Sequence, residues 1–246
     1  DKGREIRKAF IPRDEEHVLL AADYSQIELR IVASVAEDPG LMEAFNEGLD
    51  IHSATAAKVF NTPIENITKE QRYKAKSVNF GLIYGQGAFG LSNNLGISRT
   101  EAKELIDAYF KEFAGVKRYM DETIEFCRAN GYVKTLLGRK RYIPDINSAN
   151  RTVVGFAERN AINAPIQGSA ADMIKLAMIN IHRRLNNPSF KTKMILQVHD
   201  ELIFDVPKSE LEEVKPLLIA EMERAMPLKV PVLVEAGIGQ NWLEAH

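Results

Sequence analysis

The chain has few of the features that mark secreted, zinc-binding or membrane-bound proteins. Its 246 residues contain one cysteine, Cys127, so no internal disulfide can form and a cysteine-held zinc is not expected. No apolar run approaches the roughly 18 residues that a membrane span needs. The opening residues DKGREIRKAF lack the apolar core of a signal peptide. These absences predict a soluble protein of the reducing cytoplasm, without a membrane partner.

The chain also lacks a marked excess of charge of either sign. It has 32 Lys plus Arg against 34 Asp plus Glu, a formal net charge of −2. Taken alone, this balance disfavours a nucleic-acid-binding protein, because such proteins usually carry a basic excess. With 45% hydrophobic and 27% charged residues, the composition excludes intrinsic disorder. The length allows one large domain or two interleaved ones.

Strand patterns lie near the two ends of the chain, and helical patterns fill the middle. The apolar run His17–Asp23 predicts a strand, and residues 193–198 and 202–206 predict a tight antiparallel hairpin. A last strand is expected over residues 230–236. This order predicts an α+β fold, with one small antiparallel sheet built from both ends and a helical insertion between them.

Capping signals set the expected helix boundaries. The patterns S-x-x-E and T-x-x-Q predict capping boxes that open helices at Ser25 and Thr68. Pro165 is expected to end a helix that begins at residue 152, because proline has no N–H to donate. Ser209 is expected to cap a helix over residues 209–226. Two further boundaries are predicted at Ser98, as a helix start, and at Gly131, as a helix end.

Acidic side chains occupy unusual places in the predicted sheet. Asp23 ends an apolar strand, and Asp200 with Glu201 lies at the tip of an apolar hairpin. If these strands are neighbours, the acids converge, and one or two carboxylates plus substrate phosphates are the usual ligands of Mg²⁺. The alternative is an ordinary polar turn beside an ordinary strand end, and position alone favours that alternative.

The helix after Thr68 carries two cations and an aromatic residue along one stripe. Arg72, Lys76 and Phe80 are spaced by four residues and span roughly 12 Å. Such a stripe fits a nucleoside triphosphate, with Tyr84 one turn further on. The alternative is a solvated basic face with Phe80 in the core. Two cations without an acid between them favour an anionic ligand, because like charges at this spacing repel.

Three glycines after this helix match a dinucleotide-binding pattern by spacing alone. Gly85, Gly87 and Gly90 spell G-x-G-x-x-G. A dinucleotide site needs a second strand that ends in an acid about 20 residues later. The sequence EAKELIDAYFKEF in that place predicts a helix instead, so a dinucleotide site is not expected.

Other polar residues carry weaker signals. Basic clusters occur within residues 134–141 and 183–193, and either fits solvated surface. Arg159, Asn163 and Gln167 recur every four residues, and such side chains can donate to acceptors in the minor groove of DNA. As isolated residues they are explained better as helix surface or caps.

Three segments in this order resemble the family A DNA polymerases, the bacterial DNA polymerase I type. DYSQIELR (Asp23 to Arg30), RYKAKSVNFGLIYG (Arg72 to Gly85) and QVHDE (Gln197 to Glu201) resemble motifs A, B and C of that family. The resemblance runs over essentially the whole chain. It implies a right-hand polymerase, with a palm sheet that carries two metal-binding aspartates and helical fingers that close on the nucleotide.

The resemblance also implies a role for each matching residue. Asp23 and Asp200, with the Tyr24 carbonyl, would hold two Mg²⁺ ions, and Glu201 would be a catalytic acid of lesser importance. Glu28 would exclude ribonucleotides, whereas its spacing from Ser25 makes it half of a capping box. The implied nucleotide-binding residues are Tyr24, Gln26, Glu28, His52, Arg72, Lys76, Phe80 and Tyr84, with Lys76 also catalytic. The implied primer-template contacts are Arg159, Asn163, Gln167 and His199.

The resemblance finally implies a domain division and a set of partners. Residues 1–50 and 151–246 would form the palm and residues 51–150 the fingers. The family's thumb precedes the segment that matches here, so a thumbless portion is expected. The expected activity is template-directed addition of deoxynucleotides to a primer by a monomer. The alternative is a catalytically weak fragment that binds nucleotide and metal only. A magnesium-dependent phosphohydrolase is disfavoured, because no protein nucleophile stands in a suitable setting.

Overall fold

The computed structural model describes residues 2–246, and side chains from Gly3 onward. The chain divides into two compact units. The first comprises Asp1–Ile27, Ala170–Pro227 and Val232–His246, and the second comprises Glu28–Ser169 and Leu228–Pro231. Helices, a four-stranded antiparallel sheet and a separate two-stranded hairpin make up the fold, which confirms the predicted mixed class in this coarse form.

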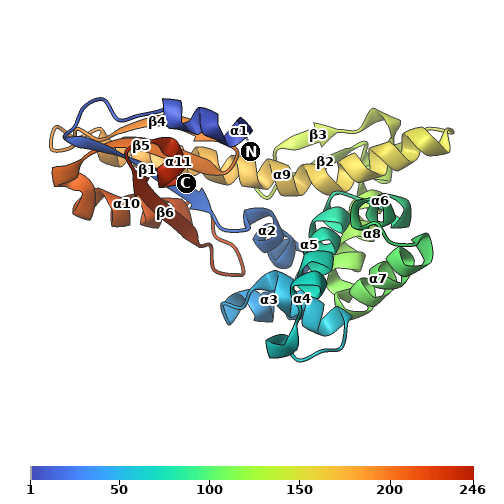
Figure 1. Ribbon diagram of the computed structural model, residues 1–246. Coiled ribbons are helices and arrows are strands. Elements are labelled where there is room, and N and C mark those ends of the chain that lie inside the picture. The colour runs from blue at the N-terminus through green and yellow to red at the C-terminus, as the bar shows by residue number, and fades with distance from the viewer. Residues whose placement is uncertain (1) are drawn as a thin grey trace. The chain divides into compact units, whose positions relative to one another are not determined.

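A four-stranded sheet forms the centre of the first unit (Figure 1). Its strands, in spatial order, are β4 (Lys193–Val198), β5 (Glu201–Pro207), β1 (His17–Tyr24) and β6 (Val234–Gly239). All neighbouring strands are antiparallel. The early strand β1 lies between two strands from the far end of the sequence, so the prediction of a sheet built from both ends is confirmed. The last strand begins at Val234 rather than at residue 230, since Pro231 has no N–H for a ladder.

Successive residues of β1 face opposite sides of the sheet. Leu19 and Ala21 face the short helix α11 (Trp242–Ala245), where they form an apolar cluster with Trp242. Tyr24 faces the other side, and its hydroxyl donates to the carbonyl of Met222 in α10 (Leu211–Glu223), 2.7 Å away. Helix α11 lies directly on β6, because a Cβ at Gly237 would stand 2.2 Å from the Ala245 carbonyl oxygen. The end of β1 therefore has one helix on each face.

Helices dominate the second unit. They are α2 (Ile27–Ala36), α3 (Pro39–Asn46), α4 (Ile51–Val59), α5 (Lys69–Ile83), α6 (Ala88–Leu95), α7 (Arg99–Glu112) and α8 (Ala114–Asn130). The capping box at Thr68 is confirmed, Ser98 caps α7, and α8 ends at Gly131 in the left-handed conformation. Strands β2 (Tyr132–Lys134) and β3 (Lys140–Tyr142) form a hairpin.

The predicted helix break at Pro165 is wrong. Helix α9 runs without interruption from Arg151 to Leu185, with Pro165 inside it. Apolar residues on both sides of the proline, Ala161 and Ile166 among them, are fully buried, and this packing offsets the lost backbone hydrogen bond. The Ser169 hydroxyl donates to the Pro165 carbonyl at 2.6 Å. None of the described helices, α9 included, is long and apolar enough to cross a membrane.

The predicted start of the helix near residue 209 is also wrong. Residues Lys208–Glu210 form a 3₁₀ turn, and α10 begins at Leu211 without a side-chain cap. Glu210 is engaged elsewhere, since its carboxylate accepts hydrogen bonds from the backbone N–H groups of Lys191 and Thr192. Pro216 lies inside α10, as Pro165 lies inside α9.

Candidate functional site

In the first unit, three carboxylates form a row across the sheet. Asp23 pairs in register with Glu201 of β5 on one side and with Glu235 of β6 on the other. Residues directly opposite each other on neighbouring strands project from the same face. Asp23 is therefore flanked by two negative charges. The convergence of Asp23 with the acids of the hairpin, predicted if the strands were neighbours, is confirmed.

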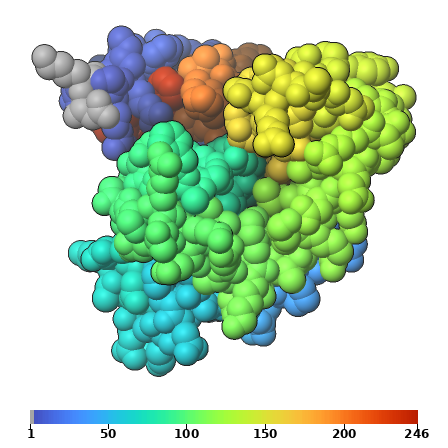
Figure 2. Space-filling view, turned by 90° about the vertical axis from the view of Figure 1, so that its right-hand side faces the viewer, coloured from blue at the N-terminus to red at the C-terminus, as the bar shows by residue number. Residues whose placement is uncertain are grey.

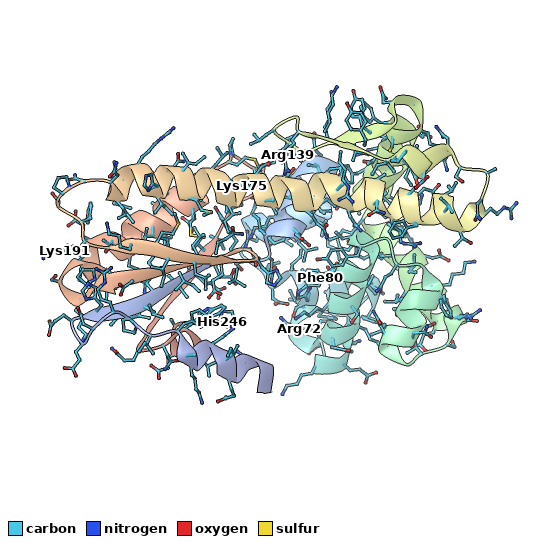
Figure 3. The ribbon with its side chains drawn as sticks, turned by 90° about the horizontal axis from the view of Figure 1, so that it is seen from above. Arg72, Phe80, Arg139, Lys175, Lys191 and His246 are labelled. Atoms are coloured by element: carbon cyan, nitrogen blue, oxygen red, sulfur yellow. The ribbon has the colours of Figure 1, made fainter. Side chains whose placement is uncertain are left out.

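The carboxylate of Glu201 is already engaged on both oxygens. The indole N–H of Trp242 donates to Oε2 at 3.0 Å, and Nδ1 of His246 lies 3.0 Å from Oε1. Trp242 is itself held by Phe10, whose ring meets the indole edge-on with centroids 5.3 Å apart. Figure 3 labels His246 in this unit. Glu201 is 4% exposed, and both of its oxygens are engaged. Asp23 is therefore the carboxylate of the pair that can still bind a ligand.

The Asp23 carboxyl is costly to keep ionised. Burial, together with the charges of Asp200 and Glu201, raises its pKa to about 6. Its Oδ1 atom is buried and has no hydrogen-bond partner among the described residues. A bound cation would relieve both conditions, because it supplies a positive charge and a ligand bond to that oxygen. The described residues include no cluster of three or more His, Cys, Asp or Glu side chains arranged for a metal. A site with two carboxylates and open positions is the kind that suits Mg²⁺.

The turn between β4 and β5 brings Asp200 beside the end of β1. The Tyr24 N–H donates to the Asp200 carbonyl at 3.3 Å, and burial raises the pKa of the Asp200 carboxyl above its ordinary value. His199, which precedes Asp200, has a φ of +54°, and Gln26 also has a φ of +54°. Left-handed backbone is uncommon for residues other than glycine and concentrates at functional sites. Four residues predicted for the site thus meet at one end of β1.

In the second unit, α5 carries the predicted cationic stripe. Figure 3 shows Arg72 and Phe80 on the same side of the helix. Arg72 makes a two-point ion pair with Asp50, with Nε to Oδ1 at 3.1 Å and Nη2 to Oδ2 at 2.7 Å. Burial alone would raise the pKa of Asp50, but hydrogen bonds from Arg72 and Ser53 lower it to about 2. Lys76 is exposed, and no described carboxylate pairs with it. Of the two cations of the stripe, Arg72 is thus paired with a carboxylate and Lys76 is not.

Three predicted aromatic residues lie in a row along α4 and α5. The ring of Phe80 stands 5.6 Å from that of His52 and is stacked on that of Tyr84 at 6.4 Å. The Tyr84 hydroxyl donates to Oε2 of Glu28 at 2.6 Å. His52 is 3% exposed, and burial, with smaller effects from the nearby cations, lowers its pKa to about 4. Four residues that the resemblance selects are thus in contact with one another, and Arg72 lies on the same helix as Phe80.

Arg159 reaches the end of α5 because of a glycine. Gly85 has a φ of +70°, and a Cβ there would lie 2.5 Å from Cγ of Arg159. Beside them is a pocket of about 560 Å³ that includes Leu82 and Ile162 in its lining. Figure 2 shows this hollow between the green surface of the middle helices and the yellow surface of α9. The three glycines follow the helix α5, whereas the glycines of a dinucleotide loop follow a strand.

The remaining predicted DNA contacts lie on α9 and the β4–β5 turn. Gln167 and His199 are exposed. Oδ1 of Asn163 is buried and has no hydrogen-bond partner among the described residues. Because α9 continues through Pro165, Arg159, Asn163 and Gln167 follow one another on a single helical stripe. The structure thus places them as a series along α9.

Several residues that contact predicted ones within either unit were not selected from the sequence. They are Asp50, Asn79, Glu235, Trp242 and His246. Each acts through a partner far away along the chain or across strands, and no local spacing marks such a partner. The aspartate at position 50 carried one usable signal, because Asp before a helical run is a common N-cap, and its carboxylate does accept from the Ser53 N–H.

Comparison with known proteins places the chain among polymerases. The family model described as DNA polymerase family A matches residues 1–244. DNA polymerase I of Streptococcus pneumoniae (strain ATCC BAA-255 / R6) is 54% identical over 246 residues, which are 100% of this chain and 28% of that protein. DNA polymerase I of Bacillus caldotenax is 50% identical over 245 residues, again 100% of this chain and 28% of that protein. The chain therefore spans less than a third of these curated relatives.

A solved structure is similar over the whole chain. It is described as the POL domain of Pol1 from M. smegmatis in complex with DNA primer-template and dNTP. Its TM-score with this chain is 0.95 at 46% sequence identity, and the match covers 100% of this chain and 43% of that one.

Proposed function

The chain belongs to DNA polymerase family A, and from this premise we propose that it carries the nucleotidyl-transfer site of a template-directed DNA polymerase. The proposed reaction is attack of a primer 3′-hydroxyl on the α-phosphorus of a deoxynucleoside triphosphate, with release of pyrophosphate. One observation carries the proposal. The buried Asp23 oxygen without a partner lies at the end of β1, where the Asp200 turn closes on it.

Asp23 and Asp200, with the Tyr24 carbonyl, are the proposed ligands of two Mg²⁺ ions. When bound, these ions would lower the pKa of the primer hydroxyl and neutralise the charge of the leaving pyrophosphate. The paired Glu201 does not join them in this arrangement, because Trp242 and His246 occupy its oxygens. Its contribution is to hold negative charge beside Asp23.

Residues of α4 and α5 are the proposed nucleotide contacts. Lys76 is free to offset charge on the leaving pyrophosphate or to donate a proton to it. Arg72 would bind the triphosphate by exchanging the Asp50 carboxylate for phosphate oxygens, which match its two-point geometry. Phe80 offers an apolar face to the sugar, and Glu28, held by Tyr84, would crowd the 2′ position.

The primer-template is the proposed ligand of the series on α9 and of His199. Arg159 supplies charge for phosphates, and the side-chain amide nitrogen of Asn163 can donate to an acceptor in the minor groove. In family terms, we assign residues 1–50 and 151–246 to the palm and residues 51–150 to the fingers, with no thumb among the 246 residues. We further propose that the protein acts as a monomer in the cytoplasm.

A second candidate is a fragment that binds nucleotide and metal but extends primers poorly. Two observations favour it, because the chain covers 28% of its relatives and carries no basic excess for DNA.

Primer extension decides between the two. The wild-type chain, Asp23→Ala and Asp200→Ala are compared on a primed template with Mg²⁺ and all four deoxynucleotides. Template-dependent extension by the wild type alone supports the polymerase. Nucleotide binding without extension supports the fragment. Pyrophosphate release without template would contradict both proposals and indicate a phosphohydrolase.

A further inference from the structure

We propose that Asn79 is a positioning residue for nucleotide binding, because its side-chain amide fixes which nitrogen of His52 carries the ring proton. The geometry makes His52 a neutral donor through Nε2, offered to an oxygen of a polyphosphate. This inference rests on the proposed function of α4 and α5 as the nucleotide-binding helices.

Asn79 is fully buried between these two helices. Its Nδ2 atom lies 3.1 Å from Nδ1 of His52 and 3.1 Å from Oγ1 of Thr55. The Thr55 hydroxyl is also 3.2 Å from Oδ1 of the same amide. His52 and Thr55 are three residues apart on α4, so both face α5. A buried asparagine that serves both residues is strongly constrained, since each unpaired polar atom would be costly there.

The chemistry of the two side chains determines the tautomer. An amide nitrogen has hydrogens to donate and cannot accept, so Nδ1 of His52 is the acceptor in this contact. A neutral imidazole carries a single proton, which therefore resides on Nε2. The ring of Phe80, 5.6 Å away, packs beside the imidazole and restricts its rotation.

His52 remains neutral because of its surroundings. Burial lowers its pKa to about 4, and the charges of Arg72 and Lys76 act in the same direction, while Asp50 opposes them. The described residues provide no hydrogen-bond partner for Nε2, and unlike Nε2 of His17 it is not sealed from solvent. Arg72 and Lys76 would supply charge to a triphosphate, and His52 would supply a donor of fixed direction.

A purely structural role for Asn79 makes a different prediction. In that case the amide only joins α4 to α5, and its loss would weaken stability and binding alike at every pH. A positioning role instead makes nucleotide affinity depend on the protonation of His52. Asn79→Asp separates the two roles, because a carboxylate of the same shape can only accept.

The first measurement is nitrogen NMR of the 246-residue chain labelled in histidine. His52→Gln identifies the His52 signals, and Thr55→Val is the matched control that removes a hydroxyl from the network but keeps the Asn79 amide. We expect Nε2–H in the wild type and in Thr55→Val, and a protonated Nδ1 in Asn79→Asp. A wild-type spectrum with the proton on Nδ1 of His52 would overturn the inference, whether or not Asn79→Asp folds.

The second measurement is calorimetric titration with dATP and Mg²⁺ as a function of pH. In Asn79→Asp the new carboxylate raises the pKa of His52, so Nε2 keeps a proton at low pH and loses it as pH rises. We expect dATP affinity to fall by about tenfold or more through that transition. The same variant carrying His52→Gln should lose this pH dependence, and wild type should not show it. A uniform loss at all pH values would assign Asn79 a structural role only. Absence of dATP binding to the wild type would refute the proposed function and leave the tautomer assignment standing.

Discussion

At the scale of single residues, Asp23 is a group that the fold keeps at a cost. Its pKa of about 6 lies above the ordinary 3.8, so the folded state binds its proton more tightly than the unfolded state does. The free energy of unfolding therefore decreases as pH rises from about 4 to about 6 and is flat above. A contribution to stability at neutral pH therefore does not explain a carboxylate in this place.

Asp23→Asn should consequently stabilise the chain at neutral pH. We expect a melting temperature about 2–4 °C higher at pH 7, the effect of roughly 1 kcal/mol in a chain of this size. The gain should vanish below pH 4, where Asp23 is protonated in both states. Mg²⁺ should raise the melting temperature of the wild type but not of the variant. Calorimetry across pH measures all three effects, and a variant less stable than wild type at pH 7 would contradict this account.

Glu28 can be tested with its hydrogen-bond partner as the control. Glu28→Ala opens space at the proposed 2′ position, and we expect ribonucleotide use to rise by at least about tenfold. Tyr84→Phe removes only the hydroxyl that donates to Glu28, so the carboxylate remains and exclusion should largely persist. Single-nucleotide incorporation with ribo- and deoxynucleotides measures the ratio. If Glu28→Ala leaves it unchanged while the melting temperature falls by several degrees, Glu28 serves the start of α2 instead.

Sequence reasoning at this scale found the residues that lie on a periodic pattern and missed their partners. Arg72, Lys76 and Phe80 are found by their spacing. Asp50 and Asn79 are not found in this way, because each contacts a residue of the other helix of the pair α4 and α5, which a loop separates in the sequence. A contact of that kind depends on how α4 packs on α5, and no local propensity encodes it.

At the scale of elements, the end of α5 depends on a glycine that serves two purposes. Gly85 has left-handed backbone and leaves room for the Arg159 side chain. Gly131 has a similar φ of +76°, but a Cβ there would meet nothing within 4 Å. An alanine at residue 131 would therefore suffer backbone strain alone, whereas an alanine at residue 85 would suffer the same strain and also collide with the Arg159 side chain.

Gly131→Ala should cost about 1–2 kcal/mol of unfolding free energy from backbone strain alone. Gly85→Ala should cost more than that, and it should also weaken primer-template binding because Arg159 is displaced. Denaturant unfolding and fluorescence anisotropy measure the two effects. Equal losses in both variants, with unchanged DNA binding, would show that the contact between Gly85 and Arg159 is unimportant.

Local sequence signals predicted the ends of elements correctly where no tertiary packing opposed them. The capping box at Thr68 and the left-handed glycine at residue 131 place helix ends where the structure has them. The helix end predicted at Pro165 was wrong, because buried apolar residues on either side stabilise α9 by more than one missing hydrogen bond costs. The predicted start of β6 at residue 230 was wrong because the apolar pattern continues through Pro231. This proline has no N–H to donate to the neighbouring strand, and β6 begins only at Val234.

At the scale of the whole molecule, charge and length together predict weak DNA binding. The net charge of −2 provides little general attraction to phosphate, and local cations must supply all of it. We expect the 246-residue chain to bind primer-template orders of magnitude more weakly than the full polymerase of Streptococcus pneumoniae. Its affinity should also fall less steeply with salt. The slope of the logarithm of the binding constant against the logarithm of the salt concentration should be smaller by about 0.9 for each phosphate contact that the chain lacks.

Anisotropy titrations of both proteins at several salt concentrations provide the measurement. Nucleotide binding through α5 should be retained, which distinguishes a missing DNA surface from a misfolded chain. Affinity and salt slope equal to those of the longer relative would show that these residues suffice to hold the duplex.

The bond between Trp242 and Glu201 has an optical consequence. Trp242 is the single tryptophan of the chain, and its indole donates to the carboxylate next to Asp23 in the sheet. Indole emission responds to charge and hydrogen bonding at its nitrogen, so the intrinsic fluorescence of the unlabelled protein reports on the carboxylate row. Binding of a cation at Asp23 would thus be measured as a change in tryptophan emission, without dye, primer or turnover. Trp242→Phe, which has no tryptophan, is the control for background emission.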